Sequence, residues 1–258
     1  MKRLKHAGQP LWLFDLDNTL HDASHAIFPA IKANMNTYIG QVLMRDAQDS
    51  AAIGDDDINE VRLRYWRRYG ATLLGMMRHH GVRADEFLHH AHTFENLPTM
   101  IRRERGLVKL LSRLPGRKIL LTNAPRRYSR DVLRHIGLHK HFARHIAIEQ
   151  MHVHRQLRPK PSTLMLRKLL AREGVHPTRA VLVEDTVETL KAAKTLGVRT
   201  VWITGYLSGS DSMRRRIDGL ANPGIRRGTA PPCINRPAYV DVKVKSVLQL
   251  PRRLARLR

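Results

Sequence analysis

The sequence is poor in cysteine, in aromatic residues and in long apolar runs. Cys233 is its single cysteine, and 5% of the residues are aromatic. A lone cysteine cannot form an internal disulfide, which excludes a disulfide-stapled domain and favours a reducing, cytoplasmic setting. The apolar run near the N-terminus is interrupted by Asp15 and Asp17. It is too short for a signal peptide, and no stretch approaches the roughly 20 residues of a membrane-spanning helix.

Acidic residues are scarce as well. The chain has 22 Asp and Glu against 46 Lys and Arg, which gives a net charge of +24 with neutral histidines. Such a charge attracts polyanions, and non-specific nucleic-acid binding stays open because Lys and Arg neutralise backbone phosphates. No recognised nucleic-acid motif accompanies the charge, so a basic surface that attracts anionic metabolites is the other interpretation. With 258 residues, 42% of them apolar, the chain is long enough to bury a sizeable core.

Short apolar runs alternate with helix-like segments in the second half of the sequence. Runs typical of buried strands lie at 11–16, 118–122, 145–148, 180–183 and 200–204. Helix-like segments separate the later runs, at 126–136, 162–173 and 187–196. This order predicts an α/β fold in which a parallel sheet is covered by helices on both faces.

The interval between the first two strands is too long for one crossover helix. Its segments 56–79 and 84–95 are helix-like, and almost nothing in it is typical of a strand. We therefore expect residues 22–100 to form a small inserted helical domain, with 101–114 as the helix that returns to the sheet. The α/β core then comprises residues 1–21 and 101–258.

The pattern loosens after the last of these strands. Residues 206–237 are rich in Gly, Pro, Ser and Arg, which predicts a basic irregular loop. The segment YVDVKVKSV that follows indicates an edge strand, and 246–256 a terminal helix.

Two aspartates end the first predicted strand. Because strand side chains alternate, Asp15 and Asp17 leave it on the same side, at the carboxyl end where open α/β sheets bind their ligands. Two adjacent carboxylates repel each other unless a cation lies between them, and Mg²⁺ prefers such oxygen ligands. The alternative is an Asp-rich turn that caps the strand.

Polar residues also end three later segments. Thr122 and Asn123 follow the second strand and can donate hydrogen bonds to phosphate oxygens, or they are an ordinary polar cap of the strand. Lys160, between two prolines, can neutralise a phosphoryl group and the first strand's carboxylate, or it is a solvated lysine. Glu184 and Asp185 end a strand and open a helix, where an acidic pair can complete a metal site; the alternative is that Asp185 simply caps the helix.

Taken in order and spacing, these residues resemble the four signature elements of the haloacid dehalogenase-like hydrolase superfamily: DxDNT at 15–19, Thr122, Lys160 and Glu184-Asp185. The resemblance implies a Rossmann-like core with an inserted α-helical cap. FDLDNTLH, RYWRRYGATL, LTNAP, RLRPKP and VEDT further resemble bacterial pyrimidine 5′-nucleotidases, over residues 10 to about 204. Thr189 departs from the pattern, because the family often has Asn or Asp there.

The resemblance also implies a mechanism. Asp15 would attack phosphorus, while Asp17 would protonate the leaving oxygen and then activate water. Thr122, Asn123 and Lys160 would bind the phosphoryl group, and Mg²⁺ would be held by Asp15, by the backbone carbonyl of Asp17 and by Asp185. Dehalogenases of the superfamily lack the second acidic residue, because a leaving halide needs no proton. Asp17 therefore favours phosphoryl transfer.

The expected function is Mg²⁺-dependent hydrolysis of a small phosphomonoester, first of all a nucleoside 5′-monophosphate. The alternatives are another small-metabolite phosphatase or a phosphomutase of the same superfamily, or a basic nucleic-acid-binding protein. The aromatic and basic cluster at 65–69 (YWRRY) would hold a base with its ribose phosphate, or it is core aromatics with solvated arginines. We expect no membrane partner.

Overall fold

The computed structural model describes residues 9–46, 53–207 and 236–257. Most of the predicted basic loop at 206–237, and Cys233 with it, lies outside the described residues. Within the described part, no helix is both long enough and apolar enough to cross a membrane.

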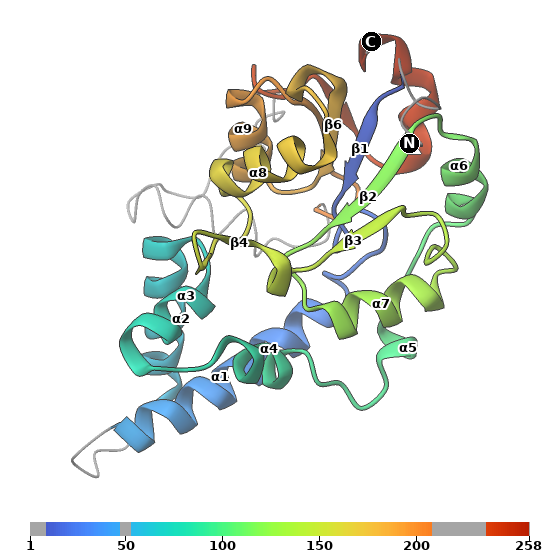
Figure 1. Cartoon of the computed structure of the whole chain (residues 1–258). Helices are drawn as coiled ribbons and strands as arrows, with labels where there is room; N and C mark the ends of the chain where they lie inside the picture. The colour runs from blue at the N-terminus through green and yellow to red at the C-terminus, as the bar shows by residue number, and fades with distance from the viewer. Residues whose placement is uncertain (1–8, 47–52, 208–235, 258) are drawn as a thin grey trace, which may run out of the picture.

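Six parallel strands form the central sheet, in the order β3-β2-β1-β6-β7-β8 (Figure 1). They are β1 Leu11–Phe14, β2 Arg117–Leu121, β3 Arg144–Ile146, β6 Ala180–Glu184, β7 Arg199–Ile203 and β8 Val242–Val244. The strands that follow β1 in the chain add to one side of it, and those that follow β6 add to the opposite side. The chain connections therefore lead away from each other between β1 and β6. Open α/β sheets bind their ligands at such a point. The predicted parallel α/β fold is confirmed, and the predicted edge strand is β8.

Side chains of β1 point alternately to the two faces of the sheet. Leu11 and Leu13 belong to one apolar cluster, with α8 (Thr163–Glu173) and α9 (Val187–Thr195). Trp12 and Phe14 belong to the other, with α6 (Leu107–Arg113), α7 (Arg126–His135) and the 3₁₀ helix η3 (Val247–Leu257). Because helices cover both faces, the central strand needs apolar residues at every position, and all four are buried.

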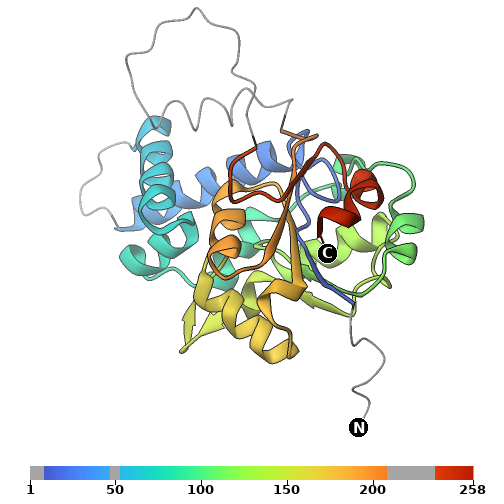
Figure 2. The same cartoon turned by 90° about the horizontal axis from the view of Figure 1, so that it is seen from above.

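Helices α1 to α4 lie together at one side of the molecule and form most of a third apolar cluster (Figures 1 and 2). Ile148 and Leu157, from outside these helices, also belong to it. The helices are α1 Ile27–Asp46, α2 Asp55–Tyr69, α3 Thr72–His80 and α4 Ala84–Ala91, and the short α5 Leu97–Met100 follows. The N–H of Asp22 donates to the carbonyl of Arg102 (2.8 Å), so the two ends of this region meet. The boundaries of an inserted domain at 22–100 stay a prediction.

The observed helices correct several expectations. The predicted 56–79 helix is two helices, because Gly70 takes a left-handed conformation (φ 78°) that ends α2. Helix α1 was not predicted, since Asn34, Asn36 and Thr37 are weak helix formers and blur its apolar periodicity. The returning helix is shorter than 101–114, because Arg102 pairs with Asp22 and Gly106 (φ 95°) precedes α6.

The sequence pattern also did not predict several short elements. β4 (His152–Val153) and β5 (Gln156–Leu157) form an antiparallel hairpin, and 3₁₀ turns η1 (Ile148–Gln150) and η2 (Pro177–Arg179) precede β4 and β6. The predicted terminal helix is the 3₁₀ helix η3, which contains Pro251. Proline supplies no N–H for an α-helical hydrogen bond.

Candidate active site

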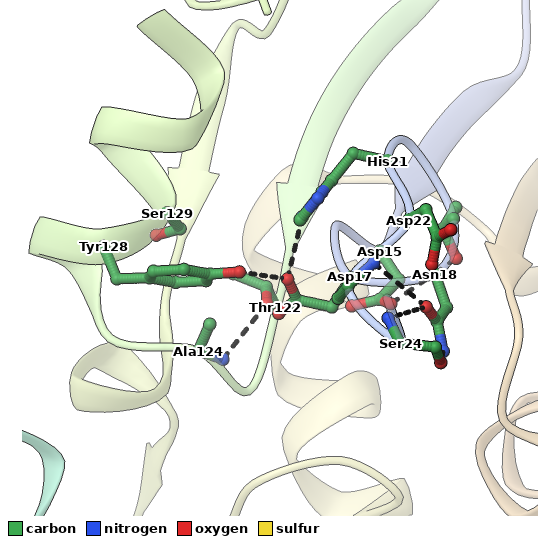
Figure 3. A network of polar contacts seen from close by, with 12 residues as sticks. Asp15, Asp17, Asn18, His21, Asp22, Ser24, Thr122, Ala124, Tyr128 and Ser129 are labelled. Carbon is green, nitrogen blue, oxygen red and sulfur yellow. Dashed lines mark hydrogen bonds and ion pairs between the residues drawn. The ribbon is translucent and has the colours of Figure 1, made fainter. Parts of the chain in front are cut away.

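A tight loop after β1 presents the two aspartates. Asp15 follows the strand directly, and its N–H donates to the carbonyl of Val183 in β6 (3.0 Å). Asn18 has a left-handed backbone (φ 56°), a conformation that Asn tolerates better than most residues. Its Oδ1 accepts from the N–H groups of Ala23 (3.2 Å) and Ser24 (3.0 Å), which closes the loop (Figure 3). The sequence DxDNT therefore encodes a rigid turn as well as two carboxylates.

One lysine and three carboxylates lie together next to this loop. Lys160 Nζ donates to Asp15 Oδ1 (2.6 Å) and to Glu184 Oε2 (2.7 Å), and all three side chains are buried. Asp185, the next residue after β6, is also buried. The structure thus brings together residues that are up to 170 positions apart in the sequence (185 minus 15). A single ammonium group faces three carboxyl groups, which leaves the cluster short of positive charge.

The pKa values in this cluster reflect that shortage. Burial, and then repulsion by Glu184, raise the pKa of Asp15 to about 7. Burial and the Glu184 carboxylate likewise hold the pKa of Asp185 well above its ordinary value. Although burial opposes it, attraction to Asp15 and Glu184 raises the pKa of Lys160, which therefore stays charged.

The three carboxyl groups also have the geometry of a metal site. Oxygens of Asp15, Glu184 and Asp185 lie within 4.8 Å of one another. Hard divalent cations bind to carboxylate oxygens, and an added cation would supply the missing positive charge. The predicted ligands Asp15 and Asp185 therefore fit a divalent metal. Glu184 was left open by the sequence, and here it accepts the hydrogen bond of Lys160.

The alternative interpretation of Asp185 as a helix cap does not hold. The N-cap residue of α9 is Thr186, whose side chain makes no capping hydrogen bond among the described residues, and the N–H of Thr186 donates to Glu184 Oε1 (3.2 Å). Asp185 Oδ1 instead accepts from Thr186 Oγ1 (3.2 Å), while its backbone carbonyl accepts from Trp202 Nε1 (3.0 Å). These contacts fix the carboxyl group at the end of β6.

Asn123 holds the lysine in place. Its Nδ2 donates to the carbonyl of Lys160 (3.0 Å), and its Oδ1 accepts from the N–H of Lys160 (2.9 Å). Two residues later Ser162 caps α8, since its Oγ accepts from the N–H of Met165 (3.2 Å). Lys160 is therefore a fixed, buried lysine, which rules out the solvated alternative. The Asn123 amide is occupied by this contact, and its binding of phosphate stays a prediction.

Thr122 lies at the end of β2, buried and close to the same site. Its Oγ1 accepts from the N–H of Ala124 (3.0 Å), and its own N–H donates to the carbonyl of Ile146 (3.0 Å). The hydroxyl proton is not used in these contacts, so it is available to a ligand. Thr189, the departure from the family pattern, is buried in α9 and lines a small cavity that Lys160 also lines.

Asp17 has a separate set of partners that the sequence did not indicate. Tyr128 Oη donates to Asp17 Oδ1 (2.5 Å), and His21 Nε2 lies 2.9 Å from the same oxygen (Figure 3). Burial opposes the shift, but these two contacts lower the pKa of Asp17. His21 is four residues from Asp17 and could have been suspected from the loop, whereas nothing in the sequence connects Tyr128, 111 residues away.

The aromatic and basic cluster at 65–69 divides between core and surface. Tyr65 is buried in the apolar cluster of α1 to α4, and its hydroxyl bonds to His80 (2.8 Å). Arg67 and Arg68 are exposed, and Trp66 is 37% exposed. The core interpretation therefore holds for Tyr65. In the described residues no histidine belongs to a group with metal-ligand geometry.

A family model matches the part of the sequence that carries these residues. The model for haloacid dehalogenase-like hydrolases covers residues 11–197, which include both aspartates of the first loop, Lys160 and Asp185. The chain belongs to the haloacid dehalogenase-like hydrolase family. It is therefore an enzyme of the hydrolase class, as the sequence motifs indicated.

Solved structures of this family share the fold at low sequence identity. A HAD phosphatase from Thermococcus onnurineus is 20% identical, with a TM-score of 0.56, 95% of this chain and 98% of that chain covered. L-2-haloacid dehalogenase from Xanthobacter autotrophicus is 15% identical, with a TM-score of 0.52 over 96% and 98%. The HAD-hydrolase YfnB from Bacillus subtilis, bound to magnesium, is 14% identical, with a TM-score of 0.51 over 96% and 99%.

The carboxyl cluster predicts a pH-dependent response to metal. The raised pKa of Asp15 means that the folded state keeps a proton which the unfolded state has already lost, so the metal-free hydrolase loses stability as pH rises toward 7. A bound cation restores the lost stability, but below pH 7 it must first displace the proton from Asp15. We therefore expect Mg²⁺ to raise the melting temperature more at about pH 8 than at about pH 6.

Thermal unfolding with and without Mg²⁺ at the two pH values measures this difference. Asp185→Asn should lose most of the shift, because it removes one carboxylate ligand without changing the shape of the side chain. Asp131→Asn, at a partly exposed aspartate in α7, is the control and should keep the shift. Equal shifts at both pH values, or an unchanged shift in Asp185→Asn, would contradict the assignment of the cluster.

Proposed function

We propose that this hydrolase is a phosphomonoesterase that acts through an aspartyl-phosphate intermediate. The observation that carries the proposal is the second acid, Asp17, fixed in the same loop as Asp15 and two residues from it. An ester oxygen needs a proton to leave, whereas a halide does not. A dehalogenase has no use for this second carboxyl group, and the structural likeness to both dehalogenases and phosphatases does not by itself choose between them.

The residues of the site support a two-step reaction. The Asp15 carboxylate attacks phosphorus, and Asp17 donates a proton to the oxygen that departs from it. Lys160 and Thr19 hold the two oxygens of Asp15 by hydrogen bonds, to Oδ1 (2.6 Å) and Oδ2 (3.5 Å) respectively. Asp17, now ionised, accepts a proton from the water that hydrolyses the aspartyl-phosphate. Its lowered pKa favours the ionised form that this second step needs, and the proton taken from water restores the acid for the next turnover. Lys160 and the Thr122 hydroxyl stabilise negative charge on the phosphoryl oxygens.

The proposed cofactor is Mg²⁺, held by the carboxylates of Asp15 and Asp185 and by the backbone carbonyl of Asp17. When bound, it would neutralise negative charge on the nucleophile and on the transferred phosphoryl group. The magnesium described for YfnB concerns that protein, and its likeness in fold supports the choice of ion here.

The proposed substrates are nucleoside 5′-monophosphates, with the pyrimidine nucleotides first. The support is the resemblance of FDLDNTLH, RYWRRYGATL and LTNAP to pyrimidine 5′-nucleotidases. The excess of Lys and Arg over Asp and Glu also favours an anionic substrate, because it raises the local concentration of anions.

A panel of substrates tests the proposal. Release of phosphate from pyrimidine and purine nucleotides, sugar phosphates and p-nitrophenyl phosphate is measured with Mg²⁺ and after chelation, beside halide release from a 2-haloacid. We expect phosphate release that stops on chelation and returns when Mg²⁺ is restored. Halide release without phosphate release would contradict the proposal, and highest efficiency on sugar phosphates would replace the nucleotide with another substrate class.

A further inference from the structure

We propose that Tyr128 and His21 are positioning residues that hold Oδ1 of Asp17 and thereby direct its Oδ2 toward the oxygen that leaves the substrate. The proposal rests on the proposed function, because it says which residues orient the acid–base group Asp17 in that same site. Neither side chain belongs to the four signature elements, although His21 is the last residue of the FDLDNTLH segment.

The Tyr128 ring is held in a position from which its hydroxyl donates to Asp17. The ring is 3% exposed, and its Oη donates to Asp17 Oδ1 at 2.5 Å. The rings of His92 and Phe94, from the segment that follows α4, lie 5.3 and 5.8 Å from it between centroids. Because the neighbouring rings fix the Tyr128 ring, removal of the hydroxyl alone should leave the packing in place.

His21 approaches the same oxygen from the loop. Its side chain is fully buried, and Nε2 lies 2.9 Å from Asp17 Oδ1. The other ring nitrogen, Nδ1, has no hydrogen-bond partner in the described residues. An unpaired polar atom costs free energy when it is buried. Folding alone therefore does not explain why the His21 ring is held in this position. Among the described residues, the His21 ring forms its hydrogen bond with Asp17. In that bond Nε2 is the donor, so Nε2 must carry the proton.

Both contacts end on one oxygen of the carboxyl group. With Oδ1 accepting from two fixed donors, rotation of the Asp17 carboxyl group is restricted, and Oδ2 is the oxygen that exchanges protons with substrate and water. General acid catalysis requires this alignment in the transition state. The requirement depends on the leaving group: an alkoxide needs the proton to depart, whereas p-nitrophenolate leaves nearly unaided. Loss of positioning should therefore weaken turnover of alkyl phosphates selectively.

The experiment compares kcat/KM for an alkyl phosphate and for p-nitrophenyl phosphate, since this constant covers the steps up to departure of the leaving group. Tyr128→Phe is expected to lose roughly 10-fold or more on the alkyl ester and less than about 3-fold on the aryl ester, a part of the 10²–10⁴-fold that general acid catalysis supplies. Asp17→Asn should show the same selectivity with a larger loss.

Two further sets of variants complete the test. His21→Gln keeps an N–H near the position of Nε2 and should retain the preference of the unaltered protein, while His21→Leu removes it and should behave like Tyr128→Phe. Tyr65→Phe is the matched control, since it also deletes a hydroxyl that bonds from a buried ring, here to His80. It should change both substrates equally or not at all.

The outcomes separate this inference from the proposed function. Equal losses on both esters in Tyr128→Phe, or no loss, overturn the positioning role while the phosphatase activity of the unaltered protein stands. Failure of the unaltered protein to hydrolyse any phosphomonoester overturns both. If His21→Leu does not fold, the comparison of His21→Gln with Tyr128→Phe still decides, because a selective loss in His21→Gln contradicts the role of its N–H donor.

Discussion

Asp15→Asn is expected to abolish turnover of every phosphomonoester while the fold remains intact. An amide is a poor nucleophile and a weak ligand for Mg²⁺, although its size and shape are nearly those of the carboxyl group. We expect a loss on the order of 10⁴–10⁶-fold, the range found when the nucleophile of a covalent mechanism is removed. Phosphate release under saturating substrate measures the loss, and circular dichroism tests the fold.

Asp22→Asn is the matched control for this substitution. Asp22 lies in the same loop, seven residues after Asp15, and its Oδ1 accepts from the N–H of His25 (3.1 Å). Activity within about threefold of the unaltered protein is expected there, since changes away from the reacting atoms cost little. A rapid acid quench should trap phosphate on the unaltered protein and not on Asp15→Asn. Near-normal rates in Asp15→Asn would contradict the aspartyl-phosphate mechanism.

Lys160→Met is expected to lower both activity and stability. The substitution keeps an unbranched stem but leaves Asp15, Glu184 and Asp185 buried together without a positive charge. Removal of one partner of a buried ion pair typically costs about 3–5 kcal/mol. Loss of a group that stabilises the phosphoryl oxygens should also lower kcat by about 10²–10³-fold. We expect Mg²⁺ to restore part of the stability but not the rate.

Lys194→Met is the matched control. Its Nζ lies 2.6 Å from Asp241, the same distance as between Lys160 and Asp15, but the Lys194 side chain is 35% exposed. The pair is partly exposed, and water screens it, so its loss should lower the free energy of unfolding by only about 1 kcal/mol or less. Urea unfolding of the metal-free proteins measures both variants. Equal effects of the two substitutions would contradict the special role of the buried lysine.

Much of the fold was predictable because apolar runs and turn residues are local signals. The runs at 11–16 and 180–183 correspond to β1 and β6, whose side chains are buried on both faces of the sheet. Helix α1 was not predictable, because its helical state depends on packing against α2 and α4 rather than on its own propensity. The two-helix structure of 56–79 depends on the backbone conformation of Gly70, for which the sequence offers several possibilities.

The sequence by itself determined the family and the order of the strands along the chain. It also predicted the site residues Asp15, Asp17, Thr122, Lys160 and Asp185, since each stands at the end of a local pattern. Only the tertiary structure decided what these residues contact. The pairing of Lys160 with Glu184, the hold of Asn123 on the Lys160 backbone and the contact of Tyr128 with Asp17 join distant segments. Such contacts arise because parallel strands bring their carboxyl ends to one edge, and a sequence pattern carries no record of which side chains then meet.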